Sequence, residues 1–250
     1  MTLPWRIVWI TGASTGIGAE VAKQLAAQGI TVAVSARKAE ALAEAAAKNS
    51  NIKAYPLDVT DEKAVASTFA SIERDLGAVD LIIAAAGAYS PVTADNFSTR
   101  PFRELYEVNY LGVINVLAAA LPIFRTRRKG HLSWVASVAG YRGLPKATAY
   151  GPTKAALINL AEALKPELAR QGVTVSVINP GFVKTPMVGQ NDFEMPFLME
   201  VEDAARATIA GLAKGKFEVA YPTPFVAILK ILRILPYRLY FWLVNKYVLK

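Results

Sequence analysis

Residues 6–28 read RIVWITGASTGIGAEVAKQLAAQ, and this stretch decides the fold. Its first part, residues 6–11, is strongly apolar and has the length of a β-strand. A glycine turn at 12–18 follows directly, and an alanine-rich helical stretch runs over 19–28. This order is typical of a dinucleotide-binding unit, because the glycines let the backbone approach a pyrophosphate at the helix N-terminus. The glycines expected at this phosphate site are Gly12, Gly16 and Gly18.

The same alternation of elements continues along the first half of the chain. We expect further strands at 31–35, 52–57 and 79–85, and helices at 39–48 and 62–76. Four strands alternating with helices predict a single Rossmann-like, doubly wound parallel sheet with helices on both faces. Ligands of such sheets bind at the carboxyl ends of the strands. The motifs found so far all fall there.

The second strand ends in the basic pair Arg37 and Lys38. In many dinucleotide folds an acid near this point binds the ribose 2′-hydroxyl, whereas a basic side chain accommodates a 2′-phosphate. The acid is missing here, so Arg37 and Lys38 favour NADP(H) over NAD(H). The alternative is a solvated basic turn.

A second group of polar residues lies within SVAGYRGLPKATAYGPTK, residues 137–154. On a helix, Tyr150 and Lys154 would share one face because they are four residues apart. A nearby ammonium favours the phenolate and is expected to move the Tyr150 pKa down towards neutrality. Ser137 could then hydrogen-bond a substrate oxygen.

Taken together, these motifs resemble the short-chain dehydrogenase/reductase family over residues 5 to about 220. The matching residues are TGASTGIG at 11–18, Asp58-Val59, AAAG at 84–87, Asn109, Ser137, Tyr150-x-x-x-Lys154, Asn179-Pro180-Gly181 and Thr185. One departure concerns AAAG, where the family often has Asn, and we expect a modest loss of local rigidity there. The family also implies a homo-oligomer.

The resemblance assigns a role to each catalytic candidate. Tyr150 would be the general acid/base, Ser137 would polarise the substrate carbonyl, and Asn109 would hold a water in a proton relay. Lys154 would lower the Tyr150 pKa and bind the nicotinamide ribose. Further cofactor contacts implied by the family are Ser14, Thr15, Ile17, Asp58, Val59, Gly87, Pro180, Gly181, Val183 and Thr185.

The segment 186–204 lies where the family carries a mobile substrate lid. Its apolar side chains are Met187, Phe193, Met195, Phe197, Leu198 and Met199. Such a lid favours a hydrophobic substrate, since methionine side chains adapt to varied shapes. The alternative is that these side chains pack the lid onto the core.

Residues 222–250 read PTPFVAILKILRILPYRLYFWLVNKYVLK and form a helical tail beyond the expected Rossmann domain at 1–221. Its cations interrupt every apolar run before the length of a bilayer span is reached. Pro236 divides the tail into two short helices whose aromatic and basic residues suit an anionic membrane interface. The alternative is that the tail covers a subunit interface or the entrance of the substrate pocket.

Composition excludes several other classes of function. The net charge is +8, but the tail holds five basic residues and no acid, which argues against nucleic-acid binding. With no cysteine and a single histidine, we expect no disulfide, no metal site and no Ser-His-Asp triad. We interpret that histidine, His131, as a strand-entry residue. The N-terminus lacks a signal-peptide pattern, so we expect a cytosolic body, and the tail adds the expectation of peripheral membrane contact.

The sequence therefore predicts an NADPH-dependent reductase of a hydrophobic ketone or aldehyde, for example a long-chain or lipid-derived one. One alternative is an NADP-dependent dehydrogenase of small secondary alcohols, because the same residues serve both directions. Another is a non-catalytic NADP(H)-binding scaffold anchored by the tail.

Overall fold

In the computed structural model, which describes residues 3–190 and 195–249, seven parallel strands form one sheet in the order β3-β2-β1-β4-β5-β6-β7. The strands are β1 Ile7–Thr11, β2 Thr31–Ser35, β3 Ile52–Ala54, β4 Leu81–Ala84, β5 Gly130–Val135, β6 Val173–Pro180 and β7 Glu218–Tyr221. The predicted doubly wound sheet is confirmed. The strand order reverses between β1 and β4, which is where such sheets bind their ligands.

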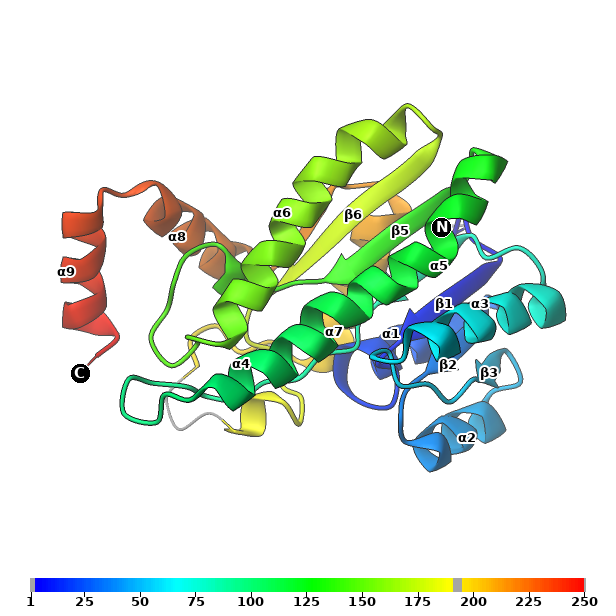
Figure 1. Cartoon of the computed structure of the whole chain (residues 1–250), viewed down its shortest axis with the longest axis horizontal. Coiled ribbons are helices and arrows are strands. Elements are labelled where there is room, and N and C mark those ends of the chain that lie inside the picture. Colours follow the sequence, from blue (N-terminus) through cyan, green and yellow to red (C-terminus); the bar gives the residue numbers. More distant parts are fainter. Residues whose placement is uncertain (1–2, 191–194, 250) are drawn as a thin grey trace.

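Helices cover both faces of the sheet (Figure 1). They are α1 Gly16–Ala27, α2 Ala39–Lys48, α3 Glu62–Leu76, α4 Thr99–Tyr106, α5 Gly112–Arg127, α6 Tyr150–Ala169, α7 Val201–Ala213, α8 Thr223–Ile234 and α9 Tyr237–Tyr247. One core cluster lies between the sheet and α1, α2 and α7, and the other lies between the sheet and α3, α5 and α6. The core thus has two layers separated by the sheet.

Two buried tryptophans show how the sheet is fixed to its helices. The Trp9 ring stacks on Phe69 of α3 at 5.5 Å, and its indole nitrogen donates to the Ser35 hydroxyl at 3.0 Å. Trp134 donates to the Leu157 carbonyl of α6 at 2.9 Å. Both indole N–H groups are therefore satisfied, as large buried aromatic side chains require. These contacts give the strand ends a rigid base.

The third strand is shorter than the sequence predicts. The predicted strand at 52–57 ends in the structure at Ala54, two residues before Pro56. Proline has no backbone N–H, so it cannot continue a regular ladder of hydrogen bonds. The chain nevertheless stays beside β2, because the backbone N–H groups of Tyr55 and Leu57 donate to that neighbouring segment.

Asn109 lies in a π-helical turn at Glu107–Leu111, between α4 and α5. The three pieces form one continuous helix, Thr99–Arg127, and within residues 3–190 and 195–249 it is the one helix long and apolar enough to span a membrane. Its α5 part buries Val116, Ala120 and Phe124 in the core. The apolar character of this helix thus serves the packing of the sheet.

The C-terminal tail forms two helices, α8 and α9, separated at Pro236 as predicted. Phe225, Val226 and Leu229 on one face of α8 join the same core cluster as β5 and α6. The α9 helix lies at the outer end of the molecule, next to α8 (Figure 1). The predicted boundary at 221/222 falls between β7 and α8.

Candidate active site

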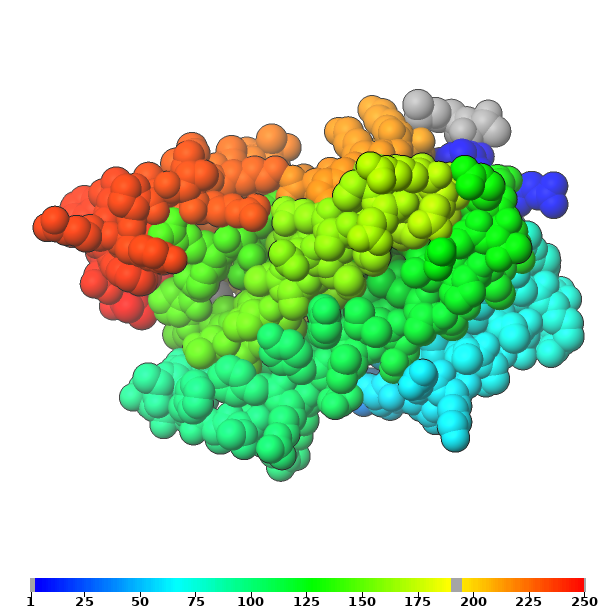
Figure 2. Space-filling model, turned by 45° about the horizontal axis from the view of Figure 1, so that its top comes forward, coloured from blue at the N-terminus to red at the C-terminus, as the bar shows by residue number. Residues whose placement is uncertain are grey.

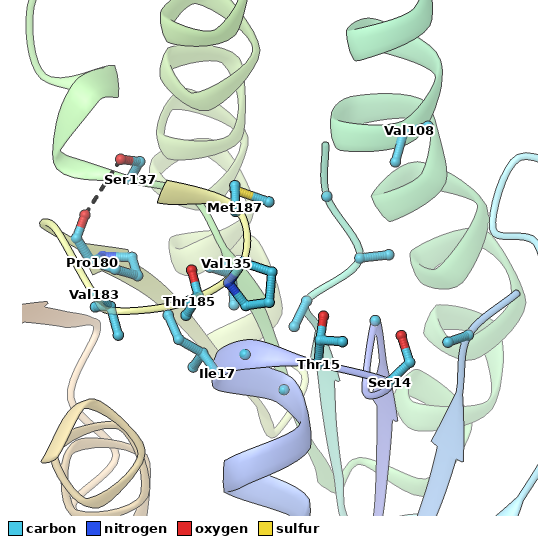
Figure 3. Close-up of a pocket in the computed structure, with 18 of the residues that line it drawn as sticks. Ser14, Thr15, Ile17, Val108, Val135, Ser137, Pro180, Val183, Thr185 and Met187 are labelled. Carbon is cyan, nitrogen blue, oxygen red and sulfur yellow. Dashed lines mark hydrogen bonds between the residues drawn. The ribbon is translucent and has the colours of Figure 1, made fainter. Parts of the chain in front are cut away.

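A cleft of about 360 Å³ opens at the carboxyl ends of the strands (Figure 3). With one exception, Asn109, every site residue predicted from the sequence lines this cleft. The lining set is Gly12, Ser14, Thr15, Gly16, Ile17, Gly18, Arg37, Lys38, Asp58, Val59, Gly87, Ser137, Tyr150, Lys154, Pro180, Gly181, Val183 and Thr185. Their positions agree with a common site, whereas their individual roles remain predictions.

The loop after β1 requires glycines because of its backbone angles and its close contacts with neighbouring backbone atoms. Gly12 and Gly16 have φ angles of +68° and +61°, a region that other residues rarely adopt. A Cβ on Gly12 would lie 2.5 Å from the Ala86 nitrogen, and one on Gly18 would lie 2.7 Å from the Gly12 oxygen. Side chains here would therefore push the loop out of the conformation that shapes the cleft floor.

The N-terminus of α1 faces the cleft with its first N–H groups free of a side-chain cap. The residue before the helix, Thr15, makes no capping hydrogen bond, and the first turn carries no acid. Uncapped N–H groups and the helix dipole together attract an anion. This end of the cleft fits the pyrophosphate of a dinucleotide.

The far end of the cleft, after β2, is basic and exposed. Arg37 and Lys38 line it, and Asp58 lies across from them after β3. Hydrogen bonds from Thr60 hold the pKa of Asp58 below its usual value, and the Arg37 charge acts in the same direction. Asp58 is thus ionised and oriented by its own turn.

The α6 helix begins at Tyr150 and places Lys154 one turn later, 5.4 Å from the Tyr150 ring centre. Ser137 arrives from the end of β5, and its hydroxyl lies 3.3 Å from the Pro180 carbonyl, an interaction drawn in Figure 3. The Ser137 hydroxyl also accepts from the Ala139 N–H at 3.1 Å. The expected Ser-Tyr-Lys grouping is present in space.

The expected lowering of the Tyr150 pKa is not what the structure gives. Burial raises the pKa of Tyr150 to about 12, although a hydrogen bond with Ser137 acts in the opposite direction. Burial also lowers the pKa of Lys154 to about 7, and the Lys154 ammonium donates to the Val135 carbonyl at 2.8 Å. Loss of water on burial is the main cause of both pKa shifts. Tyr150 therefore holds its proton at neutral pH.

Asn109 lies beside the cleft and links two segments of the chain by hydrogen bonds. Within the π-helical turn its fully buried carboxamide accepts from the Ala88 N–H at 2.7 Å and donates to the Ala88 carbonyl at 3.0 Å. It also donates to Thr153 of α6 at 3.2 Å. The side chain thus ties the loop after β4 to α6. The predicted water relay through Asn109 stays a prediction, as does reduced rigidity at Ala84–Ala86.

A second cavity, of about 130 Å³, adjoins the first at Ser137 and Tyr150. Most of its wall is apolar, with Val138, Ala139, Leu144, Pro145, Ala147, Phe182, Met187, Val188 and Phe225. Three aromatic members of this wall were not predicted from the sequence. They are Tyr89, whose ring meets Tyr150 edge to face at 5.3 Å, Phe182 and Phe225. Phe182 directly follows Gly181 at the end of β6, and Tyr89 lies two residues after Gly87 in the loop after β4; this closeness to the strand ends is the signal that could have found them.

The lid and the tail meet at this cavity. Met187 lines both cavities, whereas Phe197 stacks on Phe225 of α8 with ring centres 6.0 Å apart. Met199 instead packs on the core, and Leu198 is exposed; Phe193 lies outside the described residues. Met199 thus packs this segment onto the core, as the alternative predicted, whereas its role as a lid over a hydrophobic substrate stays a prediction. Phe225 in the first turn of α8 also lines this cavity, and the predicted position of the tail over the entrance of the substrate pocket stays a prediction.

A doubly wound sheet with a dinucleotide-sized cleft at its switch point defines a nucleotide-binding α/β protein. Residues 6–195 match the short chain dehydrogenase family. An oxidoreductase of Myxococcus xanthus is 34% identical over 238 residues, which is 94% of each chain. A short-chain dehydrogenase from Streptomyces avermitilis has a TM-score of 0.81 at 28% identity, with 90% of this chain and 91% of that one covered.

A further similar structure is an alcohol dehydrogenase from the archaeon Thermococcus sibiricus in complex with 5-hydroxy-NADP. Its TM-score is 0.78 at 26% identity, and the match covers 86% of this chain and 95% of that one. The present chain belongs to the short-chain dehydrogenase/reductase family and is an NAD(P)-dependent oxidoreductase. The non-catalytic scaffold considered from the sequence is therefore not carried forward.

Proposed function

We propose that this enzyme uses NADPH to reduce the carbonyl group of a hydrophobic ketone or aldehyde. The observation that carries the proposal is the second cavity, whose apolar wall meets Ser137 and Tyr150. An apolar pocket with a few convergent polar groups is the usual form of a small-molecule site. A substrate with an apolar body would lie there with its carbonyl oxygen against the two hydroxyl groups.

The chain's residues would bind, orient and protonate this substrate. The bound cofactor would supply the hydride. Ser137 would hydrogen-bond the carbonyl oxygen, and Tyr150 would donate its proton to that oxygen as negative charge develops on it. A phenol whose pKa lies at about 12 keeps this proton available at neutral pH. Lys154, deeply buried at the base of the cleft, is the group we assign to the nicotinamide ribose.

The preference for NADPH rests on the basic end of the cleft. Arg37 and Lys38 present positive charge where a 2′-phosphate would lie, and residues 36–38 directly after β2 include no acid that would bind a 2′-hydroxyl instead. The similar alcohol dehydrogenase in complex with 5-hydroxy-NADP supports the same choice. A charge-assisted hydrogen bond of this kind contributes about 1.5–3 kcal/mol, or roughly 10–100-fold in affinity.

A second candidate is oxidation of a secondary alcohol, favoured by the structural similarity to that alcohol dehydrogenase. The same residues serve both directions, with Tyr150 accepting the proton. This direction requires Tyr150 to ionise first, which its burial opposes. Reduction uses the protonated Tyr150 that burial favours, whereas the ratio of reduced to oxidised cofactor sets the net direction of turnover.

The test is steady-state turnover on aldehydes and ketones of increasing chain length, with NADPH and with NADH. We expect NADPH to be preferred and kcat/KM to rise with chain length. Replacing Tyr150 by Phe should lower turnover by about 10²–10⁴-fold while NADPH still binds, because only the proton donor is lost. The matched control is Tyr106→Phe, at a partly exposed tyrosine outside the cleft.

Three results would count against specific parts of the proposal. Replacing Arg37 by Ala should reduce the preference for NADPH; an unchanged NADPH/NADH ratio would remove Arg37 from the cofactor site. Activity limited to small polar carbonyls would contradict the hydrophobic substrate. Full turnover of Tyr150→Phe would contradict the assignment of the acid.

A further inference from the structure

Exposed apolar side chains are concentrated on the two C-terminal helices. Of the fifteen large apolar side chains that are exposed within the described residues, ten lie between residues 228 and 249. On α8 they include Ile231 and Ile234, which are 58% and 80% exposed, and on α9 Phe241 and Trp242, which are 55% and 53% exposed. Figure 2 shows these helices as a lobe at one end of the molecule. An apolar surface gathered in this way marks an interaction site.

The charge on this lobe has one sign. Residues 222–250 contain no acid. Two cations of α8 have acidic partners in the rest of the protein. Glu218 forms an ion pair with Lys230, and the Glu162 carboxylate lies 3.9 Å from the Arg233 guanidinium. In the described part of the chain no carboxylate pairs with Arg238 or Lys246 of α9, and the Lys246 ammonium lies 4.9 Å from the Trp242 ring centre. The α9 surface therefore combines exposed aromatic rings with two cations that lack an acidic partner.

The lobe is held in a fixed orientation by the loop that follows Ser137. The Arg142 guanidinium donates to the carbonyl oxygens of Leu232 at 2.6 Å and Leu235 at 2.8 Å, at the C-terminus of α8. It also lies 4.1 Å from the centre of the Tyr240 ring, and the Tyr240 hydroxyl donates to the Gly143 carbonyl. The inner faces of both helices are thus used for docking. Their outer faces are presented together.

We propose that α8 and α9 bind the surface of an anionic membrane. Interfacial helices bury apolar and aromatic side chains at the headgroup level while Lys and Arg attract anionic lipids, which matches the composition of this surface. A second copy of the chain is the main rival. In a twofold dimer the same patch would face itself, so that cations would meet cations with no acid of the tail between them. Charge complementarity thus favours the lipid surface.

This location also gives the proposed function a source of substrate, and this step rests on that function. Phe225 at the start of α8 lines the second cavity and stacks on Phe182 with ring centres 5.4 Å apart. The helix that would contact lipid is therefore also part of the pocket wall. A carbonyl compound dissolved in the bilayer would reach the pocket along α8.

The experiment is flotation of the full chain with vesicles of phosphatidylcholine alone and of phosphatidylcholine mixed with phosphatidylglycerol. We expect flotation with the mixed vesicles, reduced by added salt. The double variant Arg238→Glu/Lys246→Glu should lower the bound/free ratio roughly tenfold or more, since each cation near an anionic surface contributes to binding. Replacing Phe241 and Trp242 together by Ser should lower it as well.

Matched controls separate the lobe from general effects. Lys53→Glu/Lys63→Glu changes the net charge equally at exposed sites of the sheet edge and α3, and Phe97→Ser removes an aromatic ring that is 60% exposed elsewhere. Both controls should float like the natural chain. In every variant, turnover of a water-soluble carbonyl compound is measured as well. This assay shows whether the active site is intact, so that a failure of the proposed function is distinguished from a failure to bind vesicles.

Three results would overturn the proposal. These are no flotation of the natural chain, equal flotation of lobe and control variants, and a dimer in sedimentation that the lobe variants dissociate while vesicles do not bind. The last result would assign the lobe to a second copy of the chain.

Discussion

The glycine loop offers a sharp test, because two glycines with similar backbones differ in their surroundings. Gly12 and Gly29 have φ angles of +68° and +81°, so alanine at either position costs about 1–2 kcal/mol of backbone strain. At Gly29 a Cβ would meet nothing within 4 Å, whereas at Gly12 it would lie 2.5–2.6 Å from backbone atoms of Ala85 and Ala86. Forced overlap of this kind adds about 1–3 kcal/mol.

We therefore expect Gly12→Ala to lower the free energy of unfolding by about 1–3 kcal/mol more than Gly29→Ala does. Urea denaturation of the two variants and the natural chain measures this difference. A fluorescence titration with NADPH gives a second readout. Gly12→Ala should bind NADPH more weakly because the loop must move away from Ala85 and Ala86, while Gly29→Ala, at the opposite end of α1, should bind it normally.

Equal destabilisation by the two alanines would refute the reasoning. It would mean that the end of β4 yields to the added methyl group without cost, and that Gly12 is required only for its backbone angle. Destabilisation of Gly12→Ala with unchanged NADPH affinity would keep the packing argument and remove the loop from the cofactor site.

Two further predictions concern stability and the tail. Burial lowers the pKa of His131 to about 4 from its usual 6.5. Between these two pH values the unfolded chain is protonated at His131, whereas the native chain is not. The corresponding stability, roughly 3 kcal/mol, is fully present above pH 6.5 and is lost as the pH falls towards 4; unfolding curves of His131→Gln should lack this slope, and an unchanged slope would contradict the assignment. Replacing Arg142 by Ala should release α8 and α9, so that trypsin cuts at Arg233 and Arg238 several-fold faster than in an Arg100→Ala control; equal rates would show that Arg142 does not hold the tail.

The sheet and its helices were predictable because their sequence signals are local. The helices at 39–48 and 62–76 and the strand at 31–35 have the predicted bounds. Parallel strands buried on both faces appear as continuous apolar runs, and the glycine turn marks the first strand end. The cleft-lining residues followed from these elements, since parallel strands bring their carboxyl ends to one edge.

What the sequence did not predict depends on distant parts of the chain meeting. The walls of the second cavity bring together Tyr89, Phe182 and Phe225, which belong to three separate segments and share no spacing. The pKa of Tyr150 depends on how completely the site excludes water, and the Tyr-x-x-x-Lys spacing contains no information about burial. The four-residue spacing predicted that Tyr150 and Lys154 are neighbours. Burial by the surrounding side chains decided whether the pKa of Tyr150 rises or falls.

The π-helical turn at Glu107–Leu111 means that the helix around it must keep a set number of residues. A turn of this kind holds about one residue more than an α-helical turn, and one residue corresponds to about 100° of rotation. Leu105 before the turn packs with Val92 and Ala149, whereas Val113 after it packs in the main core. With one residue fewer the helix would be regular, but one of its halves would face the wrong way. The extra residue therefore sets the angular phase between two neighbouring hydrophobic clusters.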